Sequence, residues 1–197
     1  MRRCPTVETE RLLLRPFRED DLDAFTAVLQ APEVRASLHS RDDIGREDAW
    51  LGMVQWLGQW ELRGTGHWAV VEKASGTLIG RAGTHRPERP GWPGIEIGWA
   101  LHPDHWGNGY ATEAGAAAVE YAFAHFDDDE IYSVILPENL ASQAVARRLG
   151  FTPWEERVLS HFPSMPHTIW RLQRGEVQRG EVQRGEVQRG EVQRDET

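Results

Sequence analysis

The sequence predicts a mixed α/β fold of the α+β kind, with a mostly antiparallel central sheet of about six to seven strands flanked by about four helices. Two observations carry this prediction. The spacing of apolar residues changes after Gly64 from a helical period to an alternating, strand-like one, and single helices then interrupt the run of strands only twice. This order differs from the regular alternation of a doubly wound sheet. The 197 residues fit one domain.

The first half of the chain is predicted to hold one strand and two helices ahead of a hairpin. Three consecutive leucines mark the strand, an aspartate caps the first helix, and Gly64 ends the second. The expected elements are a strand over 9–17, a helix from Asp20 or Asp21, a helix over 43–63, and strands over 67–72 and 77–85 joined by a turn at 73–76.

The second half is predicted to alternate more closely between strands and helices. Apolar runs define the strands, and Gly150 closes the last helix. The expected elements are a strand over 94–101, a helix over 112–126, a strand over 131–136, a helix over 140–149, and strands over 156–161 and 167–172.

The C-terminus repeats the unit Arg-Gly-Glu-Val-Gln from Arg174 onward. Each unit offers one valine as its clear apolar residue and one glycine that weakens a helix, so it cannot bury enough surface to offset its ordering entropy. We therefore expect a domain over residues 1–173 and a disordered, low-complexity segment over 174–197. A role of this segment in binding a partner stays open.

Composition excludes several classes of protein. The net charge of −9 argues against a nucleic-acid binder and suits a cationic or amine-bearing partner. No apolar run reaches the length of a membrane helix, the N-terminus lacks the apolar core of a signal peptide, and the single cysteine, Cys4, excludes an internal disulfide. These features predict a cytoplasmic protein with no membrane partner. His102, Asp104 and His105 lack the remaining ligands of a metal site, so no metal is expected.

The stretch from Gly94 to Ala114 is the most informative part of the chain. A strand leads into a short loop with Gly107 and Gly109, and a helix begins near Ala111. Small residues let backbone N–H groups approach a ligand, and the unpaired N–H groups and dipole of a helix start favour a phosphate. The glycines alone also suit an ordinary turn, and the pattern is neither a Walker loop nor a dinucleotide fingerprint.

The whole stretch is more specific than its glycines. Trp106-Gly107-Asn108-Gly109-Tyr110-Ala111 resembles the acetyl-CoA motif Gln/Arg-x-x-Gly-x-Gly/Ala of the GNAT N-acetyltransferase superfamily, with tryptophan at the first position as in the branch of ribosomal-protein alanine acetyltransferases. Residues 9–15, 139–143 and 148–151 resemble further segments of that branch. The resemblance runs over residues 8–172 and implies a GNAT-like fold.

The resemblance also implies acetyl-CoA as cosubstrate and assigns residues to it. The pyrophosphate would sit on the loop and helix start, and the pantetheine arm would lie along the preceding strand like an added strand. Asn139 and Ser142 would contact the cofactor from the last helix. The implied contacts are Trp99, Ala100, Leu101, Trp106, Gly107, Asn108, Gly109, Tyr110, Ala111, Thr112, Asn139 and Ser142.

Attack on the thioester needs a neutral amine and therefore a base. Glu96 is the candidate, because strand alternation places it on the face opposite Ile95 and Ile97; a solvent-facing carboxylate is the alternative interpretation. Many members of the family protonate the leaving thiolate with a tyrosine of the last helix, which here has none. Ser142 could supply that proton or could only cap the helix with Asn139.

The sequence thus predicts an N-acetyltransferase acting on a primary amine of a protein N-terminus or a small molecule. The alternative is a module that binds acyl-CoA without turnover. One or two of the tryptophans at 50, 56 and 60 are expected to line the acceptor groove, with residues 81–93 forming a surface loop near it and His105 shaping the mouth of the cofactor site. Both a monomer and a homodimer remain open.

Overall fold

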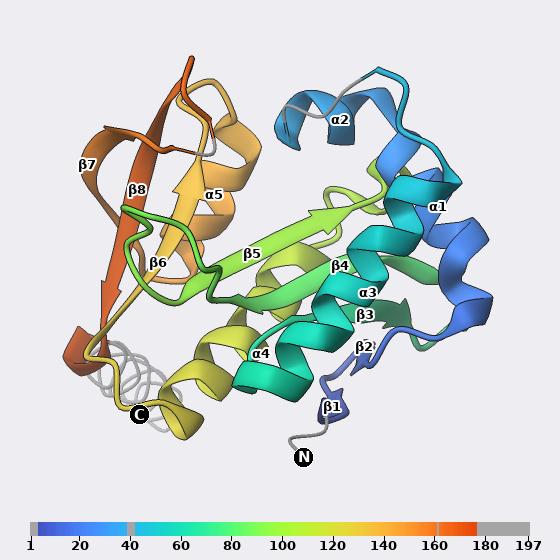
Figure 1. Ribbon diagram of the computed structural model, residues 1–197. Helices are drawn as coiled ribbons and strands as arrows, with labels where there is room; N and C mark the ends of the chain where they lie inside the picture. The colour runs from blue at the N-terminus through green and yellow to red at the C-terminus, as the bar shows by residue number, and fades with distance from the viewer. Residues whose placement is uncertain (1–3, 39–41, 161, 177–197) are drawn as a thin grey trace, which may run out of the picture.

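The computed structural model describes residues 4–38, 42–160 and 162–176 (Figure 1). They form one eight-stranded sheet in the order β1-β2-β3-β4-β5-β6-β8-β7, in which only the β5–β6 pair is parallel. The mixed, mostly antiparallel sheet is confirmed, with eight strands where six or seven were expected. The strands are β1 (Val7–Glu8), β2 (Leu12–Arg15), β3 (His67–Glu72), β4 (Leu78–His85), β5 (Glu96–Leu101), β6 (Glu130–Ile135), β7 (Thr152–Val158) and β8 (Pro166–Gln173).

Helices cover both faces of the sheet. The α-helices are α1 (Leu22–Gln30), α2 (Pro32–Leu38), α3 (Arg46–Arg63), α4 (Tyr110–His125) and α5 (Leu140–Arg148), with short 3-10 turns at Glu19–Asp21 and Pro103–His105. Figure 1 shows α1 and α3 in front of the sheet and α4 behind it. No helix within the described ranges is both long enough and apolar enough to cross a bilayer.

Three elements depart from the predicted ones. The strand expected over 9–17 is a hairpin of β1 and β2, closed where the Thr9 N–H donates to the Leu12 carbonyl at 3.0 Å. Helix α2 was not predicted; it begins at Pro32, whose fixed φ suits a first helical residue. Strand β7 begins at Thr152 rather than 156, and an irregularity after Pro153 interrupts its alternation.

Alternation along β3 shows how the two cores form. Trp68 and Val70 are fully buried in the cluster that contains residues of α4, whereas Ala69 and Val71 are buried in the cluster under α1 and α3. Small residues of α4 let it lie close to its neighbours: a Cβ on Gly115 would stand 2.7 Å from Leu149 Cδ1. The sheet is thereby fixed between two apolar layers.

The centre of the sheet is opened where β5 and β6 diverge. These strands, which α4 connects, share a single register pair, Glu96 with Tyr132, and the Tyr132 N–H donates to the Ile95 carbonyl at 2.8 Å. Beyond this pair the β5 edge that faces β6 has no strand partner within the described chain. An extended ligand could bond to the backbone there.

The repeat segment lies outside the described residues beyond Glu176. Its first residue, Arg174, contacts the domain: the guanidinium donates to the carbonyls of Phe123 and Phe126 at 2.5 Å and of Asp128 at 2.9 Å. These bonds satisfy carbonyl groups at the C-terminal end of α4 and just after it.

Candidate functional site

A cavity of about 820 Å³ lies at the start of α4, and we call it the larger cavity. Its lining contains every residue that the sequence analysis assigned to the cofactor. These residues are Trp99, Ala100, Leu101, Trp106, Gly107, Asn108, Gly109, Tyr110, Ala111, Thr112, Asn139 and Ser142. His105 lines the same cavity, as expected.

The glycine loop holds the start of α4 open toward this cavity. Gly107 and Gly109 adopt φ angles of 78° and 79°, a region that other residues enter only with strain. Gly109 is the N-cap of α4 and has no side chain that could bond to the helix start. The Trp106 indole donates to the Leu101 carbonyl at 2.7 Å and ties the loop to β5. The first-turn N–H groups therefore remain free for an anion.

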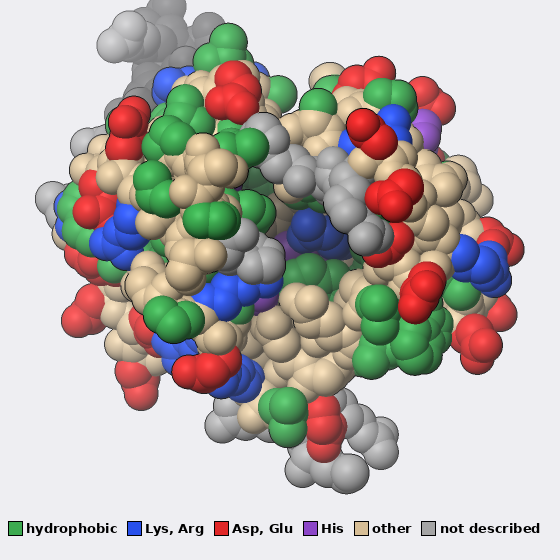
Figure 2. All heavy atoms as spheres, turned by 45° about the horizontal axis from the view of Figure 1, so that its top comes forward, with side chains coloured by type: hydrophobic (Ala, Val, Ile, Leu, Met, Phe, Trp, Pro, Cys, Tyr) green, Lys and Arg blue, Asp and Glu red, His purple; other side chains and the backbone are tan. Residues whose placement is uncertain are grey.

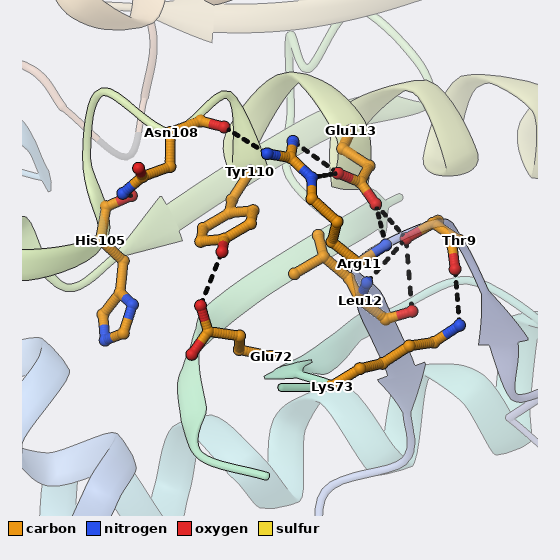
Figure 3. A network of polar contacts seen from close by, with 9 residues as sticks. All are labelled: Thr9, Arg11, Leu12, Glu72, Lys73, His105, Asn108, Tyr110 and Glu113. Carbon is orange, nitrogen blue, oxygen red and sulfur yellow. Dashed lines mark hydrogen bonds and ion pairs between the residues drawn. The ribbon is translucent and has the colours of Figure 1, made fainter. Parts of the chain in front are cut away.

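Arg11, in the turn between β1 and β2, supports this loop, a contact that no pattern in the sequence indicated. The Arg11 guanidinium donates to the Asn108 carbonyl at 2.8 Å and, through Nε, to Glu113 Oε2 at 2.7 Å (Figure 3). Thr9 Oγ1 donates to Glu113 Oε1 at 2.6 Å. Partial burial works to raise the pKa of Glu113, but the bonds from Thr9 and Arg11 outweigh it and lower that pKa. Glu113 is thus a fixed anion that holds Arg11 beside the loop, where Arg11 also lines the larger cavity.

A second cavity of about 390 Å³, the smaller cavity, lies beside the first. Residues of α2, α3, β3, β4, β5, β6, α5, β8 and the loops after β4, β6 and β7 line it. The two cavities share four lining residues, which are Ser37, Trp99, Asn139 and Ser142. A ligand in one cavity can therefore reach a ligand in the other at this junction.

Glu96 points into the smaller cavity. Ile95 and Ile97 are fully buried in the core with α4, so the predicted alternation around Glu96 is confirmed. The Glu96 side chain is 15% exposed, and its Oε2 lies 3.2 Å from Nδ1 of His85, the residue opposite it on β4. His85 Nε2 is buried and has no hydrogen-bond partner among the described residues.

Ser142 and Asn139 stand at the junction of the cavities. Asn139 Oδ1 accepts from the Ser142 N–H at 3.0 Å, so Asn139 is the N-cap of α5. The backbone of Ser142 makes this bond, and its hydroxyl has no hydrogen bond to the described part of the chain. Capping and contact with a ligand are therefore compatible at this position.

The three tryptophans considered for the acceptor groove lie in different environments. Trp56 lines the smaller cavity and stacks on His67 with 4.2 Å between ring centroids. Trp60 is buried and Trp50 is half exposed. Residues 81–85 were included both in the expected strand over 77–85 and in the expected loop over 81–93; they belong to strand β4, which pairs in register with β5. In the described ranges no group of three or more His, Cys, Asp or Glu is arranged to hold a metal.

Comparisons with known proteins agree with this geometry. The family model described as "Acetyltransferase (GNAT) domain" matches residues 11–152. The uncharacterized N-acetyltransferase YoaA of Bacillus subtilis is 30% identical over 149 residues, 75% of this chain and 82% of YoaA. An acetyltransferase structure from Agrobacterium tumefaciens is 30% identical with a TM-score of 0.74, covering 86% of this chain and 95% of that one.

One solved structure with a similar fold contains a ligand. It is Mycobacterium smegmatis RimJ in complex with CoA-disulfide, with a TM-score of 0.72 at 17% identity, covering 88% of this chain and 89% of RimJ. At that identity the likeness concerns the fold. The matches together confirm the resemblance inferred from the glycine loop and its flanking segments.

Proposed function

The chain belongs to the acetyltransferase (GNAT) family, and from that premise we propose that it transfers the acetyl group of acetyl-CoA to a primary amine by direct attack in a ternary complex. One observation carries the proposal. The larger cavity, lined by the glycine loop and β5, meets the smaller cavity, which holds Glu96, at Trp99, Asn139 and Ser142. Such a junction suits the meeting of a thioester and an amine.

The residues of the larger cavity fit acetyl-CoA. The glycine loop and the start of α4 would bind the pyrophosphate, with Arg11 adding positive charge beside it. The pantetheine arm would follow the free edge of β5, where backbone groups lack a strand partner. The CoA compound held by the RimJ structure supports this assignment.

The chemistry needs three groups at the junction. Glu96 would take a proton from the ammonium, directly or through water, so that the nitrogen lone pair can attack the acetyl carbon. A backbone N–H of β5 would stabilise the oxyanion, and the carbon–sulfur bond would then break. The departing thiolate would be stabilised by the N-terminus of α5. The Ser142 hydroxyl would donate a proton to the thiolate and regain one from the attacking nitrogen, directly or through water, so that a neutral amide and free CoA result. His85, bonded to Glu96, would orient that carboxylate.

Two measurements on the purified chain test this function. Calorimetry with CoA and acetyl-CoA should show binding, and thiol release from acetyl-CoA should depend on an added amine. No heat with either compound would refute the cofactor assignment. Binding without thiol release across a broad amine panel would instead favour a non-catalytic acyl-CoA-binding module.

A further inference from the structure

The smaller cavity has more positive than negative charge, although the chain as a whole carries −9. Two arginines, Arg81 and Arg89, line it together with one carboxylate, Glu96. No other Asp or Glu is found among the described lining residues. Figure 2 shows Lys/Arg side chains in blue and histidine in purple within the hollow. The cavity therefore differs in charge from the molecular average.

Arg81 is a partly buried cation that forms no ion pair with a carboxylate of the described residues. Within the described chain no acidic oxygen lies within ion-pair distance of it, and its Nη1 donates to His67 Nδ1 at 2.5 Å. Burial lowers the pKa of Arg81 to about 10, against the attraction of Glu96. An enclosed guanidinium that lacks a counter-ion is costly, and an anionic ligand would offset that cost.

His67 does not provide a negative charge for Arg81, but its ring has an N–H donor with no acceptor among the described residues. Burial and the neighbouring Arg81 and His85 lower the pKa of His67 well below its ordinary value, so the ring is neutral. An arginine can only donate, so Nδ1 must accept and the ring proton sits on Nε2. This Nε2 is buried, on a residue only 3% exposed, and has no partner among the described residues.

The N–H of His67 lies beside Gly98 in the wall of the smaller cavity. A Cβ built on Gly98, a residue of the cavity wall, would lie 3.2 Å from His67 Nε2. Because residue 98 is a glycine, no side chain of its own occupies the space beside the imidazole. The N–H is thus a donor available to a ligand oxygen.

Arg89 adds a second cation from the loop after β4. Its guanidinium lies 5.1 Å from the centroid of the Trp92 ring, and the described part of the chain provides no ion pair for it. Burial lowers the pKa of Arg89, while Glu96 opposes that shift. Both arginines therefore lie within electrostatic reach of Glu96.

We propose that the acceptor is a primary amine that also carries a carboxylate, such as an α-amino acid with an apolar side chain. The ammonium group would lie at Glu96, and the carboxylate would bind Arg81 and Arg89, with the His67 N–H as a further donor. Trp56, Trp92 and Phe162 provide apolar wall for the side chain. This inference rests on the proposed acetyl transfer and narrows its substrate.

Binding of a carboxylate tests the charge arrangement without turnover. Phenylacetate is titrated into the protein with and without CoA, with 2-phenylethanol as the neutral counterpart, and tryptophan fluorescence or calorimetry reports binding. Phenylacetate should bind at least about tenfold more tightly than the alcohol, and Arg81→Gln and Arg89→Gln should each remove most of that preference. Arg86→Gln is the matched control, because Arg86 pairs with Asp128 and does not line the cavity. Equal binding of the two ligands, no binding of phenylacetate, or a preference that survives in Arg89→Gln would overturn the inference.

Turnover then tests the substrate class. Thiol release is measured with L-phenylalanine, L-phenylalaninamide and phenethylamine, with the same three forms of leucine, and with spermidine and an alanine-initiated peptide. The free carboxylates should have the highest kcat/KM, by about tenfold or more, and Arg89→Gln should level the series. Equal or faster use of the amides, spermidine or the peptide would refute the inference while supporting acetyl transfer. Phenylacetate binding without thiol release from any amine would instead refute the acetyl transfer and retain the anion site.

Discussion

The two cavities of this molecule meet at Trp99, Asn139 and Ser142 yet are built in opposite ways. The larger one is formed mainly by a contiguous segment, in which glycines with positive φ and a helix start offer backbone groups. The smaller one is formed by residues from strands, helices and loops far apart in the chain, with charged and aromatic side chains among them. Backbone groups suit a ligand common to a family, whereas side chains can change from one protein to the next. From this difference we expect the chemistry shared by the family in the larger cavity and the specificity of this protein in the smaller one.

The largest effect expected is on catalysis in the smaller cavity. In Glu96→Gln the side chain keeps its size but cannot take a proton, so kcat/KM for an accepted amine should fall by about 10²- to 10⁴-fold. Steady-state thiol release measures the loss. The Kd for CoA should stay unchanged, since Glu96 does not line the larger cavity.

A matched variant separates this effect from a change in overall charge. Glu120→Gln removes one carboxylate from an exposed position on α4 and should leave kcat/KM unchanged. Equal activity of Glu96→Gln and the wild type would show that Glu96 is not the base and that the smaller cavity contributes binding alone.

The next effect should appear in the larger cavity. Gly109→Val forces a β-branched residue to a φ of 79° and places its side chain at the loop, so CoA affinity should fall by about 100-fold. Gly76→Val is the control: Gly76 has a φ of 68°, a Cβ added there would have nothing within 4 Å, and the residue lines neither cavity. Calorimetry with CoA should separate the two variants, even though both lose stability. Similar CoA affinities would mean that the phosphates bind elsewhere.

The positions changed in Gly109→Val and Glu96→Gln also show how far the sequence predicts the site. Gly107, Gly109 and the start of α4 are neighbours in the chain, so the family resemblance of one contiguous motif was enough to predict them together. Glu96 was placed by strand alternation, which depends only on its own strand. The eight-stranded sheet was undercounted because a tight turn divides β1 from β2, whereas the irregularity in β7 only obscured where that strand begins.

The residues that were missed come together only through the fold. His85 meets Glu96 because β4 and β5 pair in that register, and no rule of spacing links residues 85 and 96. Arg11 reaches Asn108 across 97 positions of the chain. Arg81 lies on the predicted strand over 77–85, but its place in the lining of a cavity depends on how other elements pack against β4. Such contacts depend on strand register and packing, which a single sequence does not determine.

A third effect concerns the pH dependence of folding stability, which follows from the burial of His67 in the wall of the smaller cavity. The folded-state pKa of His67 lies well below 6.5, so the unfolded chain binds a proton below pH 6.5 while the folded chain does not. The stability due to neutral His67 is present above pH 6.5 and is lost as the pH falls toward the folded-state pKa. Between pH 7 and pH 5 the loss should reach about 2 kcal/mol.

Urea denaturation of the wild type and His67→Gln at the two pH values isolates this contribution. Glutamine retains an oxygen that can accept from Arg81 but does not titrate. The wild type should therefore lose about 2 kcal/mol more than the variant on acidification. An equal loss in the two proteins would mean that His67 is charged in the folded state, and the neutral-ring argument for its free N–H would fail.

The smallest effect expected concerns Arg11, the side chain that braces the larger cavity. Arg11→Gln removes the bonds to Asn108 and Glu113, but the Arg11 side chain is 43% exposed and solvent screens its charge, so the Kd for CoA should rise only about threefold to tenfold. Lys73→Gln is the matched control, because Lys73 binds the same segment through the Thr9 carbonyl and lines neither cavity. Pantetheine, which lacks the phosphates, should bind both variants and the wild type alike. A loss for pantetheine as large as for CoA would show that Arg11 supports the fold of the cavity as a whole. A loss confined to CoA would show that even the cavity built from backbone groups depends on one side chain brought to it from elsewhere in the chain.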